Sequence, residues 1–510
     1  MWTFKLFSLA ALVYLPSIPS TEALTLHKRE NPAVLALPIN KRSDLGTLQK
    51  RGAKVVNVEL DNMINLRYFV NLTVGSPGQD VMLSIDTGSS DMWVNVPNSD
   101  YCSQDGDPCA LYGLFNPKKS STFKQLDYKM NATYLAGTLA VGHYATDKVK
   151  IGGATIKKAQ FAVAEDSQLG NGILGIGYKA STYAAAALSH MYPNLPQSLV
   201  DSGAIKSAAY SLWLNEFDAV GSILFGGVNK ARYEGELQTL PVVPVRGRYQ
   251  SLTLALTEII VEGSKDSTSV SKGMPLATTL DNGSPLIELP QEIVDPVLRA
   301  VGARYSSKYD LAYIDCDEAT SDYNVTFSFS GAKISVPMNA LVFPSKYRWE
   351  GLPSDECLFG IKPGQPGFSL IGDPFMRSAY IVYDLDNNEI SLAQAKFNSG
   401  DDDIHEIGTG SDAVPGAKKV ASAVSSATGN GPNPTEVPDS SEATPTIVVT
   451  ESATQTAAKD SPTGPTGTGT APASSNLVGP GDIPYHEATV FASGSCWSGS
   501  TFGFYLKIVQ

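Results

Sequence analysis

The sequence predicts an all-β protein. Over residues 55–398, short apolar runs with a two-residue period alternate with Gly, Pro, Asn and Asp, as in "TDKVKIGGATI" and "YNVTFSFSGAKISVP". This pattern is typical of half-buried strands separated by turns. Only three short stretches, 183–191, 195–202 and 291–301, are expected to be helical. Strands therefore make up most of the predicted fold.

Composition and charge narrow the possible functions. The chain has 510 residues, of which 42% are hydrophobic, so it can fill a sizeable core. Its formal net charge is −13 at pH 7, and its pI is about 4.9. Nucleic acid is excluded as a partner, because phosphate binding requires clustered Lys and Arg. An acidic chain of this kind is compatible with work at low pH, where ionised carboxylates keep a protein soluble.

The N-terminus has the features of a processed secretory protein. Residues 1–23 place Lys5 before an apolar run and small residues, which predicts a signal peptide. Residues 24–51 are predicted to be a removed pro-segment, so that the mature chain begins near Gly52. This segment carries three dibasic pairs: Lys28-Arg29, Lys41-Arg42 and Lys50-Arg51. Any single pair is equally well explained as solvated surface charge.

The five cysteines suit an oxidising compartment, in which nearby pairs are expected to form disulfides. Cys102 and Cys109 flank a short turn-rich loop, and Cys316 and Cys357 form the natural second pair. Cys496 is left unpaired. The cysteine spacing does not match a zinc site, and the histidines form no ligand cluster. We expect no metal and no other cofactor.

Composition changes after residue 400. Residues 401–485 are rich in Ser, Thr, Pro and Gly, which predicts a disordered, O-glycosylated stalk. Such a stalk suggests a tether to a membrane or cell wall. Residues 486–510 form an atypical tail. A GPI anchor requires a longer hydrophobic end than this tail offers, and Lys507 interrupts it, so the GPI signal is degraded.

One internal repeat divides the chain into two similar lobes. "VMLSIDTGSSDMWV" (81–94) and "ATTLDNGSPLIELP" (277–290) share the order apolar strand, Asp, polar residue, Gly, Ser and a second apolar strand. Asp86 and Asp281 are about one domain's length apart. We therefore expect an N-lobe over 52–235 and a C-lobe over 236–400, with one aspartate in each.

Two aspartates held close together can hydrolyse a peptide bond. They share one proton, so that one carboxyl acts as a base toward water and the other as an acid toward the substrate. Gly88 and Gly283 allow close backbone approach. The hydroxyls of Ser89 and Ser284 are expected to bond the outer oxygens of the two aspartates. Either copy alone is better explained as a β-turn with Asp at its first position.

The chain resembles the pepsin-type aspartic endopeptidases, and more closely their fungal, surface-anchored yapsin-like branch. The resemblance covers about residues 68–397. It rests on "YFVNLTVGSPGQDVMLSIDTGSSDMWV", "YLAGTLAVGHYATDKVKIGG", "NGILGIGY" and "SLIGDPFMRSAYIVYDLDNNEISLA". The two expected disulfides fall where this family usually has them.

This resemblance implies a bilobal, pepsin-like all-β fold with a peptide cleft between the lobes. Asp86 and Asp281 would share the catalytic water, and Tyr134 would be the tyrosine of a mobile flap hairpin. Trp93, a core residue by its sequence pattern, would also support Tyr134. Asp373 is expected to be structural. The substrates would be polypeptides and the protein a secreted monomer.

The sequence departs from the family at one residue. The family has Thr or Ser after each catalytic Asp, and the two hydroxyls form a hydrogen-bonded grip between the lobes. Thr87 fits this pattern and Asn282 does not. An Asn amide both donates and accepts, so part of the grip is expected to survive. The alternative is a catalytically impaired homologue that serves as a peptide-binding or cell-wall protein. Because both aspartates and both serines are present, we predict an active enzyme.

Four Asn-x-Ser/Thr sequons are present, at Asn71, Asn131, Asn282 and Asn324. A glycan on Asn282 would block the predicted cleft, and Pro285 directly after that sequon disfavours modification. We therefore predict glycosylation at Asn71, Asn131 and Asn324, and none at Asn282.

Overall fold

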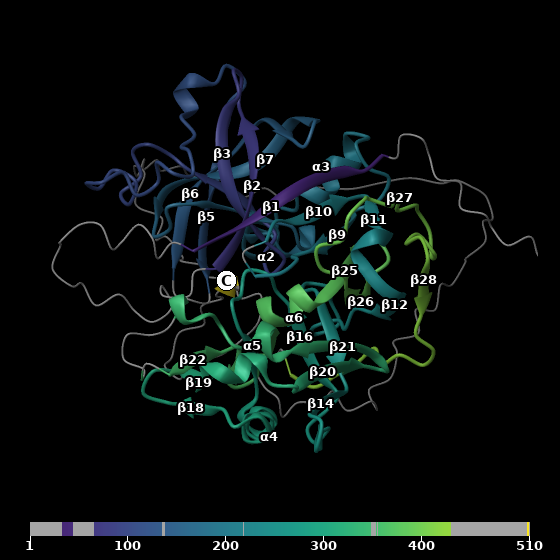
Figure 1. Ribbon diagram of the computed structural model, residues 1–510. Coiled ribbons are helices and arrows are strands. Elements are labelled where there is room, and N and C mark those ends of the chain that lie inside the picture. Colours follow the sequence, from purple (N-terminus) through teal and green to yellow (C-terminus); the bar gives the residue numbers. More distant parts are fainter. Residues whose placement is uncertain are drawn as a thin grey trace, which may run out of the picture.

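β-Strands are the predominant secondary structure of the described chain, which confirms the predicted all-β class. The computed structural model describes residues 33–43, 66–134, 138–217, 219–347, 353, 355–429 and 507–508. The predicted signal peptide, most of the pro-segment and Cys496 lie outside the described residues. Figure 1 shows one group of strands above and another below, with further strands between them.

The largest sheet joins the upper group to the middle of the molecule. It has 15 strands among the described residues. In order across the sheet they are β28 (Ala417–Lys419), β12 (Tyr233–Pro241), β26 (Glu389–Ala395), β25 (Ala379–Asp384), β9 (Ala209–Trp213), β10 (Gly221–Phe225), β1 (Leu35–Ser43), β2 (Leu66–Val74), β3 (Gln79–Asp86), β8 (Gly172–Gly175), β4 (Met92–Asn95), β7 (Ala154–Ser167), β6 (Leu139–Ile151), β5 (Lys124–Tyr134) and β29 (Lys507–Ile508).

Smaller sheets complete the fold, and most of them belong to the lower lobe. A five-stranded sheet has the order β13 (Thr253–Leu256), β16 (Leu276–Leu280), β24 (Leu370–Ile371), β17 (Ile287–Leu289) and β23 (Ile361–Pro363). A four-stranded sheet has the order β15 (Ser267–Val270), β14 (Glu258–Glu262), β20 (Asn324–Phe329) and β21 (Ala332–Pro337). The remaining strands are β18 (Arg304–Ser306), β19 (Leu311–Asp315) and β22 (Glu356–Phe359) in one sheet, and β11 (Gly227–Asn229) with β27 (Ile404–Glu406) in another.

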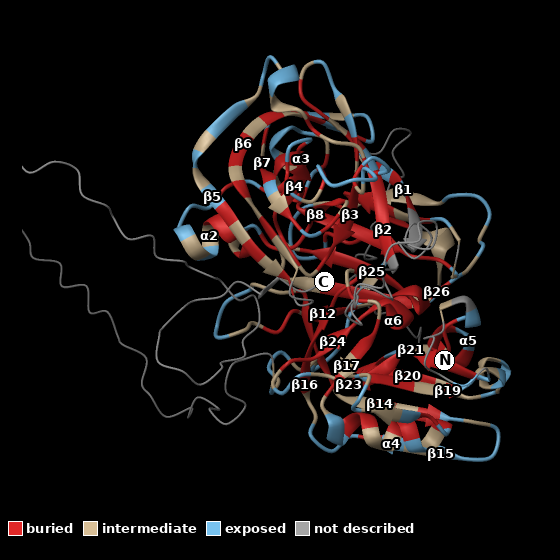
Figure 2. Cartoon of the chain, turned by 90° about the vertical axis from the view of Figure 1, so that its left-hand side faces the viewer, coloured by how far each residue is buried: buried red, intermediate tan, exposed pale blue. Residues whose placement is uncertain are grey.

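The three expected helices are present. They are α2 (Tyr183–Leu188), α3 (Leu195–Asp201) and α4 (Gln291–Val301), and the structure adds the short α5 (Met338–Leu341) and α6 (Asp373–Ser378). Helix α2 ends earlier than predicted, because Ser189 adopts a left-handed conformation with φ of 54°. Within the described ranges, no helix combines the length and hydrophobicity needed to traverse a lipid bilayer. Figure 2 shows buried residues running through both lobes, with exposed residues mainly in the outer loops.

The two copies of the sequence repeat have matching surroundings. In the upper lobe, β3 pairs in parallel with β8, which places Asp86 opposite Gly175. In the lower lobe, β16 pairs in parallel with β24 directly before Asp281. Each aspartate therefore follows a buried strand whose neighbour runs in the same direction. The repeat seen in the sequence corresponds to a repeated supersecondary structure.

Strand β1 lies within the predicted pro-segment. It pairs with β10 through Leu35–Ile39 and with β2 through Asn40–Ser43, and it buries Leu35, Leu37 and Ile39. The dibasic pair Lys41-Arg42 falls inside this strand, where its backbone is paired with β2. A protease can therefore cut at this site only if the strand first leaves the sheet.

The predicted start of the stalk at residue 401 is wrong, because the folded structure continues to Gly429. We call residues 401–429 the C-terminal strap. Its strand β27 pairs with β11, and its strand β28 pairs in parallel with β12 (Figure 1). Ile407 and Val414 are buried against an apolar cluster that includes Trp213. The few apolar residues of the strap are enough to hold it because its backbone groups also find partners.

The strap contacts residues of both lobes. Asp402 accepts hydrogen bonds from Asn229 Nδ2 (2.8 Å) and Arg232 Nη2 (2.7 Å). Farther along, the Ala277 N–H donates to the Thr428 carbonyl at 2.7 Å. The strap therefore links the end of the upper lobe to β16, the strand that precedes Asp281.

Removal of the strap is expected to destabilise the protein. A chain ending at Gly400 exposes the surface that Ile407 and Val414 cover, and burial of each such side chain is worth about 1.5–3 kcal/mol. We expect its melting temperature to fall by roughly 5 °C or more in calorimetry. A chain ending at Gly429 should melt with the full-length protein. Equal melting of the two truncated chains would contradict this role of the strap.

Candidate active site

Asp86 and Asp281 are brought together from the two lobes. Their exposed fractions are 2% and 0%. A Cβ atom added at Gly88 would lie 2.8 Å from Oδ1 of Asp281, and one added at Gly283 would lie 2.8 Å from Oδ1 of Asp86. Both positions therefore require glycine, because a side chain would occupy the space of the opposite carboxyl. The two carboxyl groups are close enough for each to affect the pKa of the other.

Backbone donors orient both aspartates in the same way. Gly88 N donates to Asp86 Oδ1 and Gly283 N donates to Asp281 Oδ1, both at 2.8 Å. On Asp86 the second oxygen accepts a hydrogen bond from the Ser89 hydroxyl, as predicted.

The prediction for Ser284 is wrong. Its hydroxyl donates to the carbonyl of Leu286 at 3.2 Å and does not bond Asp281. The turn at Pro285 brings that carbonyl within reach, and a nearby backbone acceptor competes with the carboxylate. Asp281 Oδ2 is buried and makes no hydrogen bond with any described residue. The two aspartates therefore differ in the number of donors that stabilise their charge.

The electrostatics of the pair follow from burial and proximity. Burial raises the pKa of Asp86 from its ordinary value of 3.8 to about 6, against the opposing effect of the Ser89 and Gly88 donors. Burial and, next, the negative charge of Asp86 raise the pKa of Asp281 well above its ordinary value. Because two charges so close together cannot both ionise readily, the pair retains a proton in acid.

Thr87 and Asn282 form a reciprocal set of four hydrogen bonds between the lobes. Thr87 N donates to Asn282 Oδ1 at 2.8 Å, and Asn282 N donates to Thr87 Oγ1 at 3.0 Å. The Thr87 hydroxyl donates to the Leu280 carbonyl at 3.1 Å, and Asn282 Nδ2 donates to the Ile85 carbonyl at 3.1 Å. The amide of Asn282 thus accepts and donates with two separate atoms, as a hydroxyl would with one. The expected partial grip is complete in the structure.

Tyr134 is the last residue of β5. Its hydroxyl accepts a hydrogen bond of 2.5 Å from Nε1 of Trp93, which is itself fully buried. Burial and then the charge of Asp86 raise the pKa of Tyr134 well above its ordinary range. The structure therefore brings the predicted flap tyrosine within electrostatic range of the aspartate pair. Trp93 is both a core residue and the support of Tyr134.

Sequence reasoning did not identify a second buried contact between the lobes. The Tyr68 hydroxyl of β2 donates to Asp373 Oδ1, and Arg377 Nε donates to Asp373 Oδ2 at 2.9 Å. Asp373 was predicted to be structural, and its position in this network fits that role. Tyr68 and Arg377 could have been found only from their place in the family-like blocks, since neither belongs to a spaced motif.

The disulfide and sequon predictions can be placed on the structure. Both predicted disulfides are formed, Cys102 with Cys109 and Cys316 with Cys357. Among the sequons, Asn71 is exposed, whereas Asn131 and Asn324 are half-buried. Asn282 is 1% exposed and its amide is fully used in the grip, so the folded protein cannot carry a glycan there. In the described part of the chain, no group of His, Cys, Asp and Glu side chains is arranged to hold a metal ion.

Comparison with known proteins identifies the family. The family described as "Eukaryotic aspartyl protease" matches residues 67–395. The chain is 43% identical over 432 residues to the "Probable aspartic-type endopeptidase opsB" of Aspergillus oryzae, covering 83% of this chain and 88% of that protein. The "Acid protease" of Saccharomycopsis fibuligera is 35% identical over 373 residues, covering 72% of this chain and 90% of that protein. "Aspartic proteinase yapsin-3" of Saccharomyces cerevisiae is 35% identical over 383 residues, covering 72% of this chain and 73% of that protein.

The chain therefore belongs to the eukaryotic aspartyl protease family, and it is an aspartic-type endopeptidase. The predicted resemblance to this family is confirmed, and yapsins are among the relatives at lower identity than opsB.

Replacement of Asn282 is expected to test the grip. Asn282→Ala leaves the buried Thr87 N–H and Ile85 carbonyl without partners, at a cost of about 1–3 kcal/mol for each group. Asn282→Ser restores one donor and one acceptor, and we expect it to recover most of that loss. Urea unfolding of the wild type and both variants measures the difference. If alanine and serine cost the same free energy of unfolding, the amide has no bridging role.

The raised pKa of Asp86 predicts a pH dependence of stability. The unfolded chain ionises this carboxyl near pH 3.8, whereas the folded chain holds its proton up to about pH 6. The contribution of this carboxyl is therefore complete below pH 3.8 and is lost as the pH rises toward 6. Asp86→Asn should flatten the fall in the free energy of unfolding across this window, as measured by urea unfolding at several pH values. Parallel curves for the wild type and the variant would refute the expected shift.

Proposed function

We propose that the protein is a secreted or cell-surface endopeptidase that hydrolyses polypeptides at acid pH with a water activated between Asp86 and Asp281. The observation that carries this proposal is the pair of buried carboxyls, one from each lobe, with raised pKa values. A pair that keeps one proton in acid contains a base and an acid at once, which is the requirement of direct hydrolysis by water. The name "Acid protease" of one relative supports the proposed pH range.

In the proposed mechanism the shared proton resides mainly on Asp281. Asp86 has two donors, Gly88 N and the Ser89 hydroxyl, that stabilise its ionised form, whereas Asp281 has an oxygen without a donor. Ionised Asp86 removes a proton from water as the water oxygen attacks the peptide carbonyl carbon. Asp281 gives its proton to the carbonyl oxygen, which yields a neutral tetrahedral diol. Collapse of the diol breaks the C–N bond: one hydroxyl proton returns to Asp281, and the proton on Asp86 passes to the leaving nitrogen.

Tyr134 is proposed to close over the bound peptide. It lies at the end of a hairpin strand and within range of Asp86, and Trp93 fixes its hydroxyl. Closure of such a hairpin excludes bulk water, which strengthens the electrostatic interactions inside the site.

The alternative, a catalytically impaired homologue, was motivated by Asn282. Asn282 makes the donor and acceptor contacts expected of a hydroxyl at this position. The reason for expecting impaired catalysis is therefore weakened. We therefore propose an active enzyme rather than a peptide-binding wall protein.

The remaining proposals concern processing and location. We propose a signal peptide over 1–23, a pro-segment over 24–51, and a Ser/Thr-rich tether that begins after the strap, at residue 430. The tether would hold a monomeric enzyme at a cell wall or, through a GPI anchor, at a membrane.

Cleavage of a denatured protein by the processed chain tests the function. We expect turnover between about pH 3 and 6 that a statine-type inhibitor blocks. Asp86→Asn and Asp281→Asn should each lower kcat/KM by roughly 10²–10⁴-fold or more, because each removes one proton-transfer group. Absence of cleavage by the wild type across this range, or unchanged turnover in both variants, would show that the proposed function is wrong.

A further inference from the structure

Asp91 is a buried carboxylate that the proposed mechanism does not use. It is 1% exposed and lies five residues after Asp86 in the same loop. Among the described residues, no Lys, Arg or His forms an ion pair with it. Its charge is instead stabilised by three hydrogen-bond donors, since a buried ion without partners would be very costly.

The three donors come from three segments: β6, the start of α2 and the loop after α2. The Tyr144 hydroxyl, on β6 of the flap hairpin, donates to Asp91 Oδ1 at 2.7 Å. The Tyr192 hydroxyl, in the loop after α2, donates to the same oxygen at 2.6 Å. Tyr183 N, at the first residue of α2, donates to Oδ2 at 2.5 Å. A further bond of 3.2 Å from Ala184 N to the Tyr144 hydroxyl joins α2 to β6 directly.

The backbone of Asp91 is held as firmly as that of Asp86. The Asp91 carbonyl accepts a hydrogen bond from Gly175 N at 2.9 Å. In the same way, the Asp86 carbonyl accepts from Ile176 N at 2.9 Å. Both aspartates of this loop are thus hydrogen-bonded to one buried segment, so the backbone that carries the Asp91 side chain is held in place.

The group around Asp91 is continuous with Tyr134. Tyr134, Tyr144, Tyr183 and Tyr192 belong to one buried cluster together with Trp93. The rings of Tyr144 and Tyr192 meet edge to face at 5.8 Å between centroids. Any shift of β6 or α2 relative to the loop that carries Asp86 would therefore also move the residues packed against Trp93 and Tyr134.

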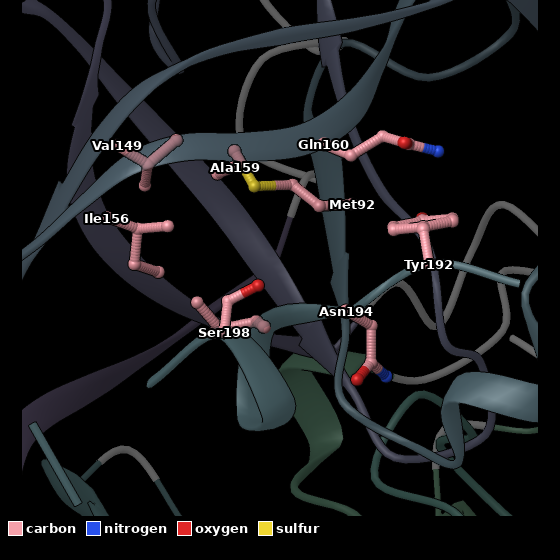
Figure 3. Close-up of a pocket in the computed structure, with 9 residues that line it drawn as sticks. Met92, Val149, Ile156, Ala159, Gln160, Tyr192, Asn194 and Ser198 are labelled. Carbon is pink, nitrogen blue, oxygen red and sulfur yellow. The ribbon is translucent and has the colours of Figure 1, made fainter. Parts of the chain in front are cut away.

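Packing alone does not hold Tyr192 in place. Its ring lines a small cavity together with Met92, Asn194 and Ser198, and Figure 3 shows these side chains around the open space. The cavity has room for about one water molecule. Because the ring has free space on this side, the hydrogen bond to Asp91 limits its movement together with the packing on Tyr144.

We propose that Asp91 is a positioning residue, which locks the flap strand β6 and the start of α2 to the loop that carries Asp86. This inference rests on the proposed function, because it assigns Asp91 a part in that reaction. Among the described residues, the hydrogen bonds of the Asp91 side chain go to Tyr144, Tyr183 and Tyr192 and not to Asp86 or Asp281. Asp91 acts through Tyr144, Tyr183 and Tyr192 on the buried cluster that contains Tyr134.

Two alanine variants compared at equal folded fraction test this role. Asp91→Ala removes the common acceptor, and we expect kcat/KM to fall by about 10–100-fold, since small misplacements of reacting groups have effects of this size. Asp147→Ala is the matched control, because Asp147 is also 1% exposed, lies on β6, and accepts hydrogen bonds from Thr122 Oγ1 and Lys148 N. The control should keep kcat/KM within about threefold of the wild type. Asp91→Asn, which keeps the shape and one acceptor oxygen, should recover most of the loss.

Hydrogen exchange gives a second readout that does not depend on activity. In Asp91→Ala the amides of Tyr183–Leu188 should exchange faster than in Asp147→Ala. Should Asp91→Ala fail to fold, Tyr144→Phe and Tyr192→Phe each remove one donor and keep the ring, and their effects on kcat/KM and exchange should follow the same direction. The inference is overturned if exchange in α2 stays unchanged, or if Asp91→Ala and Asp147→Ala lower kcat/KM equally. Absence of cleavage by the wild type would instead refute the proposed function, and the exchange comparison would still decide the role of Asp91.

Discussion

The reciprocal hydrogen bonds between Thr87 and Asn282 are the constraint on which the geometry of the site depends. Each lobe supplies one aspartate on a tight turn, and neither turn can set the distance between the two carboxyls. These four reciprocal hydrogen bonds fix this distance, since each of the two residues also binds the backbone carbonyl just before the opposite aspartate. These groups are buried, so water does not compete for them and the bonds are stronger than they would be at the surface.

Holding two carboxyls in contact is unfavourable when both are ionised, and the surrounding fold must resist their separation. The Tyr68–Asp373–Arg377 network adds a second buried contact between the lobes. The C-terminal strap adds a third on its way from Asn229 to Ala277. The strap lies beyond residues 67–395, the part of the chain that the family match covers.

Asn282 shows how a departure from a family pattern can preserve its physics. By residue type, an amide in place of a hydroxyl indicates a weakened grip. In the structure the two functions of the hydroxyl are divided between Oδ1 and Nδ2, and both the Thr87 N–H and the Ile85 carbonyl are satisfied. A motif therefore specifies which contacts are required, and more than one side chain can supply them.

The sequence by itself determined the all-β class, the repeated aspartate turns, both disulfides and the tyrosine beside Asp86. The class and the turns are predictable because strand period and turn residues are local properties of the chain. The disulfides were predicted from the number and position of the cysteines, and Tyr134 only from the resemblance to a known family. Only the tertiary structure decided that Ser284 bonds Leu286, that Asp91 joins three tyrosine-bearing segments, and that residues 401–429 are folded. Each of these depends on which group comes within about 3 Å of another. For Asp91 and the strap, those groups come from segments far apart in the chain, and no local pattern records that approach.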